Sequence, residues 1–331
     1  MSDYVLPPDV RITESITPFS EAVSWADDML GIEDAWRSSQ GKGVKVAILD
    51  TGCFQHADLE GAILDRKDFT NSRVGPDDQH GHGTHVSSLV GARSGNNIGI
   101  RGVAPLCSIL HGKVLGDSGG GSEESIAAGI LWAYDSGAWV VSLSLGGPGS
   151  MPRLASLVAE LCRDAKMVKR PFVLVAAAGN DGAALNHPAA TNGFVPVGAY
   201  DQLGVITRFT SRSEKLKVLG PGVKMLGCLP GGRYGEMTGT SQATPIVAAI
   251  VALALAKEAE IGSETKIESS QDAEDHMVRN AVDAVNGSRF KLVNARKAME
   301  AIKAKPIPHD ERPWSILGTL WGWRYARQKV T

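Results

Sequence analysis

Three short apolar runs decide the fold of this chain: KVAIL at residues 45–49, WVVSLSL at residues 139–145 and FVLVAAA at residues 172–178. Runs of this kind are typical of strands that are buried on both faces of a parallel sheet. Between them lie helical stretches after residue 82, at 123–134 and at 151–169. Strands that alternate with helices predict an α/β fold, in which a doubly wound, mostly parallel sheet carries helices on both faces.

The composition excludes several classes of protein. Of 331 residues, 43% are hydrophobic and 21% are charged, so disorder is excluded as the main state. The net charge of −2 gives no electrostatic footprint for nucleic acid. The longest apolar run, residues 246–256, is too short for a membrane span, which needs about 20 residues. We therefore interpret that run as a buried core helix and expect no membrane span.

Cysteine use and the N-terminal sequence indicate a cellular compartment. Cys53, Cys107, Cys162 and Cys228 lie far apart, and no pair has the short spacing of a zinc or redox motif. The first residues have neither the basic start nor the apolar segment of a secretory signal. We therefore expect a cytoplasmic protein with free thiols.

Three glycine-flanked segments contain the residue types of a nucleophilic site. They are ILDTGC around Asp50, HGHGTHV around His82 and GTSQATP around Ser241. A serine hydroxyl is inert at neutral pH unless a base takes its proton and an acid orients that base. Ser241 opens an apolar helical run, so its hydroxyl is expected at a helix N-terminus, where negative charge is favoured. The segment AAAGN ends at Asn180, whose amide is a candidate oxyanion donor. Asp50, Ser144 and Asn180 fall at or just after strand ends, where ligands bind in such sheets.

Each of these residues has a simpler interpretation when taken alone. Asp50 is then a turn residue, and Ser241 is an N-cap. His82 is then a core or metal histidine, since His80 and His85 are close by. The joint occurrence of the three segments in the chain order Asp, His, Ser favours a catalytic triad.

These segments resemble those of the subtilisin-like serine proteases, the subtilase family. The resemblance runs from about residue 25 to residue 302 and includes KVAILDTG, HGHGTHV, NNIGIRGVAP, SLSLGGP, AAAGN and GTSQATP. The cysteine in DTGC, the missing signal and the LPP of the N-terminal arm are most similar to the intracellular subtilisins. The resemblance implies Asp50 as orienting acid, His82 as general base, Ser241 as nucleophile and Asn180 as oxyanion-hole donor.

The function that this resemblance implies is a serine endopeptidase. It would hydrolyse peptide bonds of intracellular proteins or peptides through an acyl-enzyme intermediate. Gln242 stands where the family usually has Met, and Ile246 where a His is common, so we expect altered packing and retained chemistry. Two other functions stay open: a subtilase-type transpeptidase or macrocyclase, and a catalytically silent peptide-binding module.

The resemblance also implies where a substrate lies. The segment SLSLGGP resembles the edge on which an extended peptide is bound, with Ser144, Leu145 and Gly146 as contacts. The alternative is a core strand that ends in a turn. The loop before residue 187 is shorter than in many relatives, which places Asn186 near the floor of the primary pocket and Asp181 near its rim.

A structural calcium ion is the expected cofactor. Asp58 matches a calcium-ligand position of the family, and Asn96 or Asn97 with nearby carbonyls would add hard oxygen ligands. The alternative is a solvated loop without an ion.

Three parts are expected along the chain: an N-terminal extension at residues 1–21, a subtilisin-like peptidase domain at 22–305 and a tryptophan-rich tail at 306–331. In the extension, Pro7 and Pro8 lack an N–H and fix φ, so the segment YVLPP is expected to occupy the substrate groove without being cut readily. The alternative is a plain terminus.

The tail carries Trp314, Leu317 and Trp321 on one predicted helical face, followed by basic residues. It would pack on the chain's own core or on a second copy in a homodimer. The alternative is docking on another partner subunit or on an anionic membrane surface.

Overall fold

The computed structural model describes residues 10–12, 21–263, 266–285 and 289–305. Most of the expected N-terminal extension and the whole expected C-terminal tail lie outside these residues. The predictions for residues 4–8 and for the tryptophan-rich tail therefore lie outside the described residues.

A nine-stranded sheet forms the centre of the described part. All neighbouring strands pair in parallel, except β11 with β12. In spatial order the strands are β11 (Val282–Asp283), β12 (Lys291–Leu292), β8 (Val218–Pro221), β7 (Phe194–Tyr200), β6 (Val173–Ala177), β5 (Val140–Leu143), β2 (Lys45–Asp50), β4 (Ser108–Lys113) and β3 (Ile63–Asp68).

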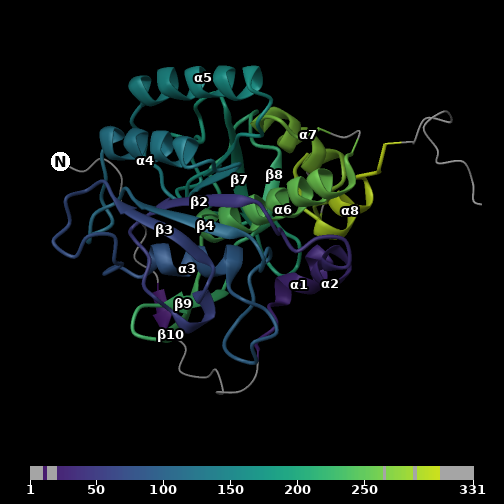
Figure 1. The fold of residues 1–331 in the computed structure, drawn as a ribbon, viewed down its shortest axis with the longest axis horizontal. Coiled ribbons are helices and arrows are strands. Elements are labelled where there is room, and N and C mark those ends of the chain that lie inside the picture. The colour runs from purple at the N-terminus through teal and green to yellow at the C-terminus, as the bar shows by residue number, and fades with distance from the viewer. Residues whose placement is uncertain (1–9, 13–20, 264–265, 286–288, 306–331) are drawn as a thin grey trace, which may run out of the picture.

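Alternating side chains of β2 explain why helices cover both faces of the sheet. Val46 and Ile48 belong to a core with residues of α3 (His82–Gly91) and α6 (Thr240–Ile261). Ala47 and Leu49 belong to a second core with residues of α4 (Glu123–Asp135) and α5 (Pro152–Met167). Figure 1 shows α4 and α5 together on one side of β2 and β4, with α3 on the other. The predicted doubly wound α/β fold is confirmed.

Shorter elements complete the described chain. They are α1 (Trp25–Leu30), α2 (Ile32–Trp36), the 3-10 turn η1 (Ala57–Leu59), α7 (Ser270–Arg279) and α8 (Ala295–Glu300). The segment 290–302, which the spacing predicts as one helix, instead contains β12 followed by α8. The side chain of Asn294 accepts a hydrogen bond from Lys297 N (2.9 Å), which caps α8 and starts the helix only after it.

A second, antiparallel sheet lies beside α3 and is made of β1 (Val10–Ile12), β10 (Arg233–Met237) and β9 (Met225–Leu229). Figure 1 shows this small sheet on the far side of α3 from the main sheet. The N-terminal residues 10–12 are extended, as the sequence predicts for the arm, and pair with Met237, Glu236 and Gly235. The strand that receives them ends three residues before α6 begins.

Candidate active site

Asp50 and His82 meet at the carboxyl end of β2. Asp50 is the last residue of β2, and His82 is the first residue of α3. Asp50 Oδ1 lies 2.7 Å from His82 Nδ1, and both side chains are buried. Burial would raise the pKa of Asp50, but the facing His82 ring and the Thr51 N–H hold that pKa below its ordinary value. The pair is therefore an ionised carboxylate that orients an imidazole.

Glycines allow α3 to start this close to β2. A Cβ on Gly83 would lie 2.1 Å from the carbonyl oxygen of Gly52, so no larger residue fits there. Gly81, the N-cap of α3, has φ 95°, a conformation that L side chains rarely adopt. The glycines of HGHGTHV therefore let α3 begin close to the end of β2, as the sequence predicts for glycine at these positions.

A buried carboxylate that the sequence analysis missed fixes the same helix start. Asp78 accepts hydrogen bonds from His80 N (3.0 Å), Gly81 N (2.8 Å) and Thr84 N (2.8 Å), and from the Thr51 hydroxyl (3.0 Å). A negative charge at a helix N-terminus is stabilising. An acidic residue shortly before a glycine-flanked helix start was the available signal.

Ser241 sits in the first turn of α6 and is tied to Ser144, just beyond β5. Ser144 Oγ donates to Ser241 O (2.7 Å), and Ser241 Oγ donates to Ser144 O (3.2 Å). The first contact has a clear cause: Pro245 is four residues further on and has no N–H to donate to the Ser241 carbonyl. The proline of GTSQATP therefore leaves the Ser241 carbonyl free to accept from the Ser144 hydroxyl. This contact holds the serine against the end of β5.

Asn180 follows β6 and packs against the start of α6. Its Oδ1 accepts hydrogen bonds from Thr240 N (2.8 Å) and from the Thr240 hydroxyl (3.0 Å). Because both donors reach the carbonyl oxygen of the amide, the Nδ2 end is left to donate elsewhere. That is the end an oxyanion would require.

One cavity of about 190 Å³ gathers the residues that sequence reasoning assigned to substrate binding. Ser241 and Asn180 line it together with Ser144, Leu145, Gly146, Asp181 and Asn186. Asn186 fills space beside two glycines, since a Cβ on Gly146 would lie 3.1 Å from its Cβ and one on Gly179 would lie 2.7 Å from its Nδ2. Asp181 accepts hydrogen bonds from the Ser211 hydroxyl (2.5 Å) and Ala183 N (2.9 Å), which lower its pKa.

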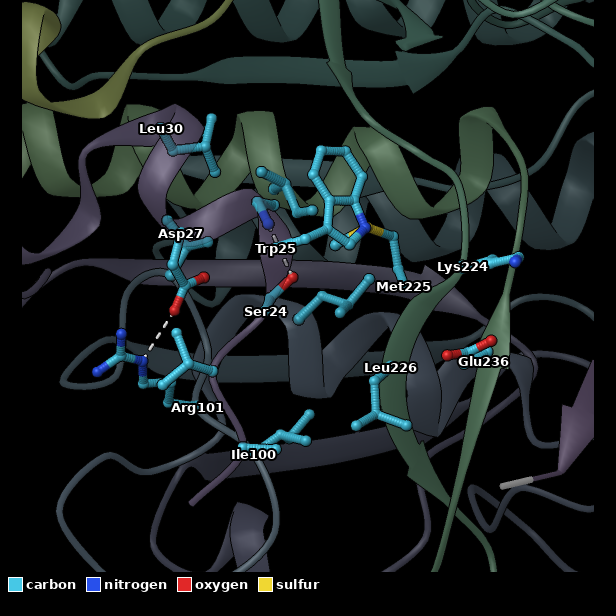
Figure 2. Close-up of a pocket in the computed structure, with 16 residues that line it drawn as sticks. Ser24, Trp25, Asp27, Leu30, Ile100, Arg101, Lys224, Met225, Leu226 and Glu236 are labelled. Carbon is cyan, nitrogen blue, oxygen red and sulfur yellow. Dashed lines mark hydrogen bonds and ion pairs between the residues drawn. The ribbon is translucent and has the colours of Figure 1, made fainter. Parts of the chain in front are cut away.

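A second cavity, of about 180 Å³, lies between α1, β9 and the loop around Arg101. Figure 2 shows the Asp27–Arg101 ion pair (2.9 Å) at one edge and Glu236 at the other, with Trp25 between them. None of the residues that line it belongs to the Ser241 site.

Two of the predicted calcium ligands, Asp58 and Asn96, are engaged in hydrogen bonds. Ca²⁺ takes six to eight oxygen ligands. The buried Asp58 carboxylate instead receives hydrogen bonds from Ile100 N (2.9 Å), Asn96 Nδ2 (3.3 Å) and the Cys228 thiol (3.7 Å). Each is a donor where calcium would need an acceptor, and Asn96 Oδ1 already accepts from Ile98 N (3.1 Å). These contacts do not fit a Ca²⁺ ion at Asp58. The role of Asn97 as a calcium ligand stays a prediction.

A doubly wound sheet that sets an Asp–His pair and a helix-borne serine at one edge is the arrangement of a serine hydrolase. The family model described as "Subtilase family" matches residues 41–297. The chain belongs to this family and is a subtilisin-like serine protease.

Three curated relatives show how far the similarity extends. The chain is 38% identical to the major intracellular serine protease of Bacillus subtilis (strain 168) over 226 residues, 65% of this chain and 69% of the relative. It is 36% identical to the intracellular serine protease of Paenibacillus polymyxa over 237 residues, 68% of this chain and 71% of the relative. It is 33% identical to thermitase of Thermoactinomyces vulgaris over 289 residues, 86% of this chain and 98% of the relative.

Within the described residues, no helix is long and apolar enough to cross a membrane. The 22 residues of α6 include the apolar run 246–256, whose side chains are all buried, as the sequence predicts for a core helix.

Proposed function

We propose that this serine endopeptidase uses Asp50 as orienting acid, His82 as general base, Ser241 as nucleophile and Asn180 as oxyanion donor. The observation that carries the proposal is the 2.7 Å contact between Asp50 Oδ1 and His82 Nδ1 at the strand end. It holds the Nδ1–H on the carboxylate, so Nε2 keeps the lone pair that a base needs.

In the proposed reaction, Ser241 Oγ leaves its contact with Ser144 O and donates to His82 Nε2. Nε2 takes the proton as Oγ bonds to the peptide carbonyl carbon, and negative charge moves to the carbonyl oxygen. Asn180 Nδ2 and the N-terminus of α6 would stabilise that charge. His82 then protonates the leaving amine, and water activated by the same base hydrolyses the acyl-enzyme.

The proposed substrates are proteins or peptides inside the cell, bound as an extended strand along Ser144, Leu145 and Gly146. Support comes from the cavity these residues share with Ser241 and from two relatives that are named intracellular serine proteases. Asn186 at the floor and Asp181 at the rim would restrict the side chain that enters. We propose the cytoplasm as the place of action on the same grounds.

Two further predictions are kept as proposals about the whole chain. Residues 1–21 would restrain the enzyme by lying along the groove, and the pairing of residues 10–12 with β10 supports a course near α6. A homodimer formed through the tail stays a prediction. Subtilases often bind Ca²⁺, but the donors around Asp58 do not support calcium there, and no catalytic step depends on it.

Incubation with a peptide library, followed by mass spectrometry, tests the function. A hydrolase yields cleaved fragments, a transpeptidase yields ligated or cyclic products, and a silent binding module leaves the peptides unchanged. The same data report the side-chain preference at the cleavage site. A Ser241→Ala variant is the matched control and is expected to leave every peptide intact.

A further inference from the structure

Lys113 is a buried lysine at the end of the strand that neighbours the strand of Asp50. Asp50 and Lys113 are the last residues of β2 and β4, and they lie opposite each other in the register of these parallel strands. The Lys113 side chain is fully buried, and no other lysine of the described residues is buried. A buried charge is costly unless polar groups surround it. The partners of this ammonium therefore indicate what it does there.

The Lys113 ammonium joins three connections at the carboxyl edge of the main sheet. It donates to the carbonyl of Thr51, which follows β2, and to the carbonyl of Asp77 (3.3 Å), which lies before α3. It also pairs with Asp117 Oδ1 (2.8 Å), which lies after β4. The hydrogen bond from Lys113 lowers the pKa of Asp117, so this carboxylate is ionised at neutral pH. An ammonium has three donors, and these three partners use all of them.

The contact with Thr51 holds a residue that touches both sides of the Asp50–His82 pair. Thr51 N donates to Asp50 Oδ1 (2.8 Å), the same oxygen that faces His82 Nδ1. The Thr51 hydroxyl accepts from Gly83 N (2.9 Å), directly after His82. By fixing the Thr51 carbonyl, the Lys113 ammonium fixes the distance between the end of β2 and the start of α3.

The contact with Asp77 acts on the other side of the same gap. Asp77 directly precedes Asp78, whose carboxylate accepts hydrogen bonds from the first N–H groups of α3. A Cβ on Gly52 would lie 2.8 Å from the Asp77 carbonyl oxygen, so the two backbone segments are in close contact where Lys113 joins them. A shift of either segment would move the first turn of α3 relative to β2.

We propose that Lys113 is a positioning residue for peptide hydrolysis: its buried ammonium holds the Thr51 and Asp77 carbonyls so that His82 Nδ1 stays on Asp50 Oδ1. The inference rests on the proposed function, because it assumes the roles given there to Asp50, His82 and Ser241. Lys113 does not line the cavity at Ser241, so it acts through the backbone and not on the substrate. Its loss should therefore slow the chemical step and leave substrate binding almost unchanged.

The first test separates kcat from KM in the full chain. Lys113→Met keeps a long apolar stem and removes the three donors. We expect kcat on a chromogenic peptide to fall about 10–100-fold and KM to change by less than about twofold, because a small displacement of a catalytic group has a large effect on rate. Lys217→Met, which removes an ion pair with the buried Glu274, is the matched control and should keep the wild-type kcat. Rates are normalised to folded protein by circular dichroism.

The second test reads the Asp50–His82 contact itself and does not depend on turnover. In chains that carry Ser241→Ala, the proton between Asp50 Oδ1 and His82 Nδ1 should give a far-downfield resonance in the proton NMR spectrum. Lys113→Met should shift this resonance upfield or broaden it, whereas Lys217→Met should leave it in place. If Lys113→Met does not fold, Asp117→Ala replaces it, because the Asp117 side chain is 43% exposed and its loss releases the ammonium. The resonance should then move in the same direction, and kcat should fall several-fold.

Failure of this proposal and failure of the proposed function give different results. A wild-type kcat in Lys113→Met, or in Asp117→Ala where that variant replaces it, overturns the positioning role if Ser241→Ala is inactive in the same assay. An unmoved resonance, with a loss of rate that the folded fraction explains, limits Lys113 to a role in stability. Full turnover in Ser241→Ala would instead reject the proposed function, whatever Lys113→Met does.

Discussion

At the scale of single residues, the position of Ser241 depends on a carbonyl that its own helix cannot satisfy. Pro245 lacks the N–H that would bond Ser241 O, and the Ser144 hydroxyl takes its place at 2.7 Å. The serine is therefore fixed to the end of β5, beside the segment proposed to bind substrate. Its own hydroxyl donates to Ser144 O at 3.2 Å.

Ser241→Ala is expected to lower kcat by several orders of magnitude and to leave the Tm almost unchanged, because only the attacking oxygen is removed. The measurement is turnover of a chromogenic peptide, with circular dichroism to check the fold. Ser156→Ala, on an exposed part of α5, controls for loss of a hydroxyl. A wild-type rate in Ser241→Ala would reject the assignment.

Substitutions of Asn180 can test its acceptor oxygen and its donor nitrogen separately. Asn180→Asp keeps the acceptor for Thr240 N and Oγ1 and removes the Nδ2 donor. We expect kcat to fall at least 10²–10³-fold, about 2.7–4 kcal/mol, with a smaller change in KM. Asn180→Ala should lose a similar factor in kcat and also some stability. An Asn180→Asp variant with full kcat would exclude the amide as oxyanion donor.

Asn186 offers a test of specificity. Its side chain lies against Gly146 and Gly179 in a cavity of about 190 Å³. Asn186→Ala should enlarge the pocket and raise kcat/KM for substrates with Phe at the cleavage site, relative to Ala, by about tenfold or more. Parallel assays on two peptides that differ only at that residue measure the ratio. An unchanged ratio would place the pocket floor elsewhere.

At the scale of elements, α3 connects the main sheet to the small sheet through His85. This buried ring approaches Met225 O on β9 (3.0 Å) and Gly235 O on β10 (3.1 Å) with its Nε2. Burial, with a smaller effect of nearby His82, lowers the pKa of His85 to about 4. The native ring is therefore neutral at pH 7 and donates one N–H to these two carbonyls.

The lowered pKa makes stability depend on pH in a definite direction. Between about pH 6.5 and pH 4 the unfolded chain binds a proton at His85 and the native chain does not. The free energy of unfolding should therefore fall with decreasing pH, by about 1.4 kcal/mol per pH unit for this residue. His85→Gln keeps an N–H donor without titrating, so urea unfolding of Ser241→Ala variants should show a shallower slope for it. His187→Gln controls for loss of a histidine, and equal slopes in all three chains would contradict the assignment.

The elements also explain what the sequence could predict. Buried parallel strands are continuous apolar runs, so β2, β5 and β6 were visible, and with them the strand ends that carry Asp50, Ser144 and Asn180. The glycine-flanked starts of α3 and α6 were visible because close packing requires residues without a Cβ. The helical spacing of segment 290–302 conceals β12, because its two strand residues leave little periodic signal.

The contacts that complete the site were harder to predict from the sequence. Asp78 caps α3 through loop geometry, and Asp58 meets Cys228 across 170 residues. Such contacts arise from tertiary folding rather than from local pattern. The sequence therefore predicted that Asp50, Ser144 and Asn180 lie at strand ends, but it did not predict the contacts that hold their neighbours in place.

At the scale of the whole molecule, the N-terminal arm and the serine helix are joined through one strand. Residues 10–12 pair with β10, and β10 leads within three residues to α6, which carries Ser241 in its first turn. Residues 3–9 precede the paired segment, and seven residues at roughly 3.3 Å each span at most about 23 Å. The proposed course along Ser144–Gly146 therefore requires the groove to lie within that distance of residue 10.

Removal of residues 1–20 tests this course. We expect the chain that begins at Glu21 to show a several-fold higher kcat/KM on one small peptide substrate, because the groove no longer has an occupant in cis. A synthetic peptide covering residues 4–12 should inhibit the shortened enzyme competitively. The same peptide with Pro7 and Pro8 replaced by alanine should be cut instead, since only the prolines withhold the N–H and fix φ. A shortened enzyme of equal activity that the peptide does not inhibit would make the arm a plain terminus, and a less stable one with unchanged kcat/KM would limit its role to the strand beside β10.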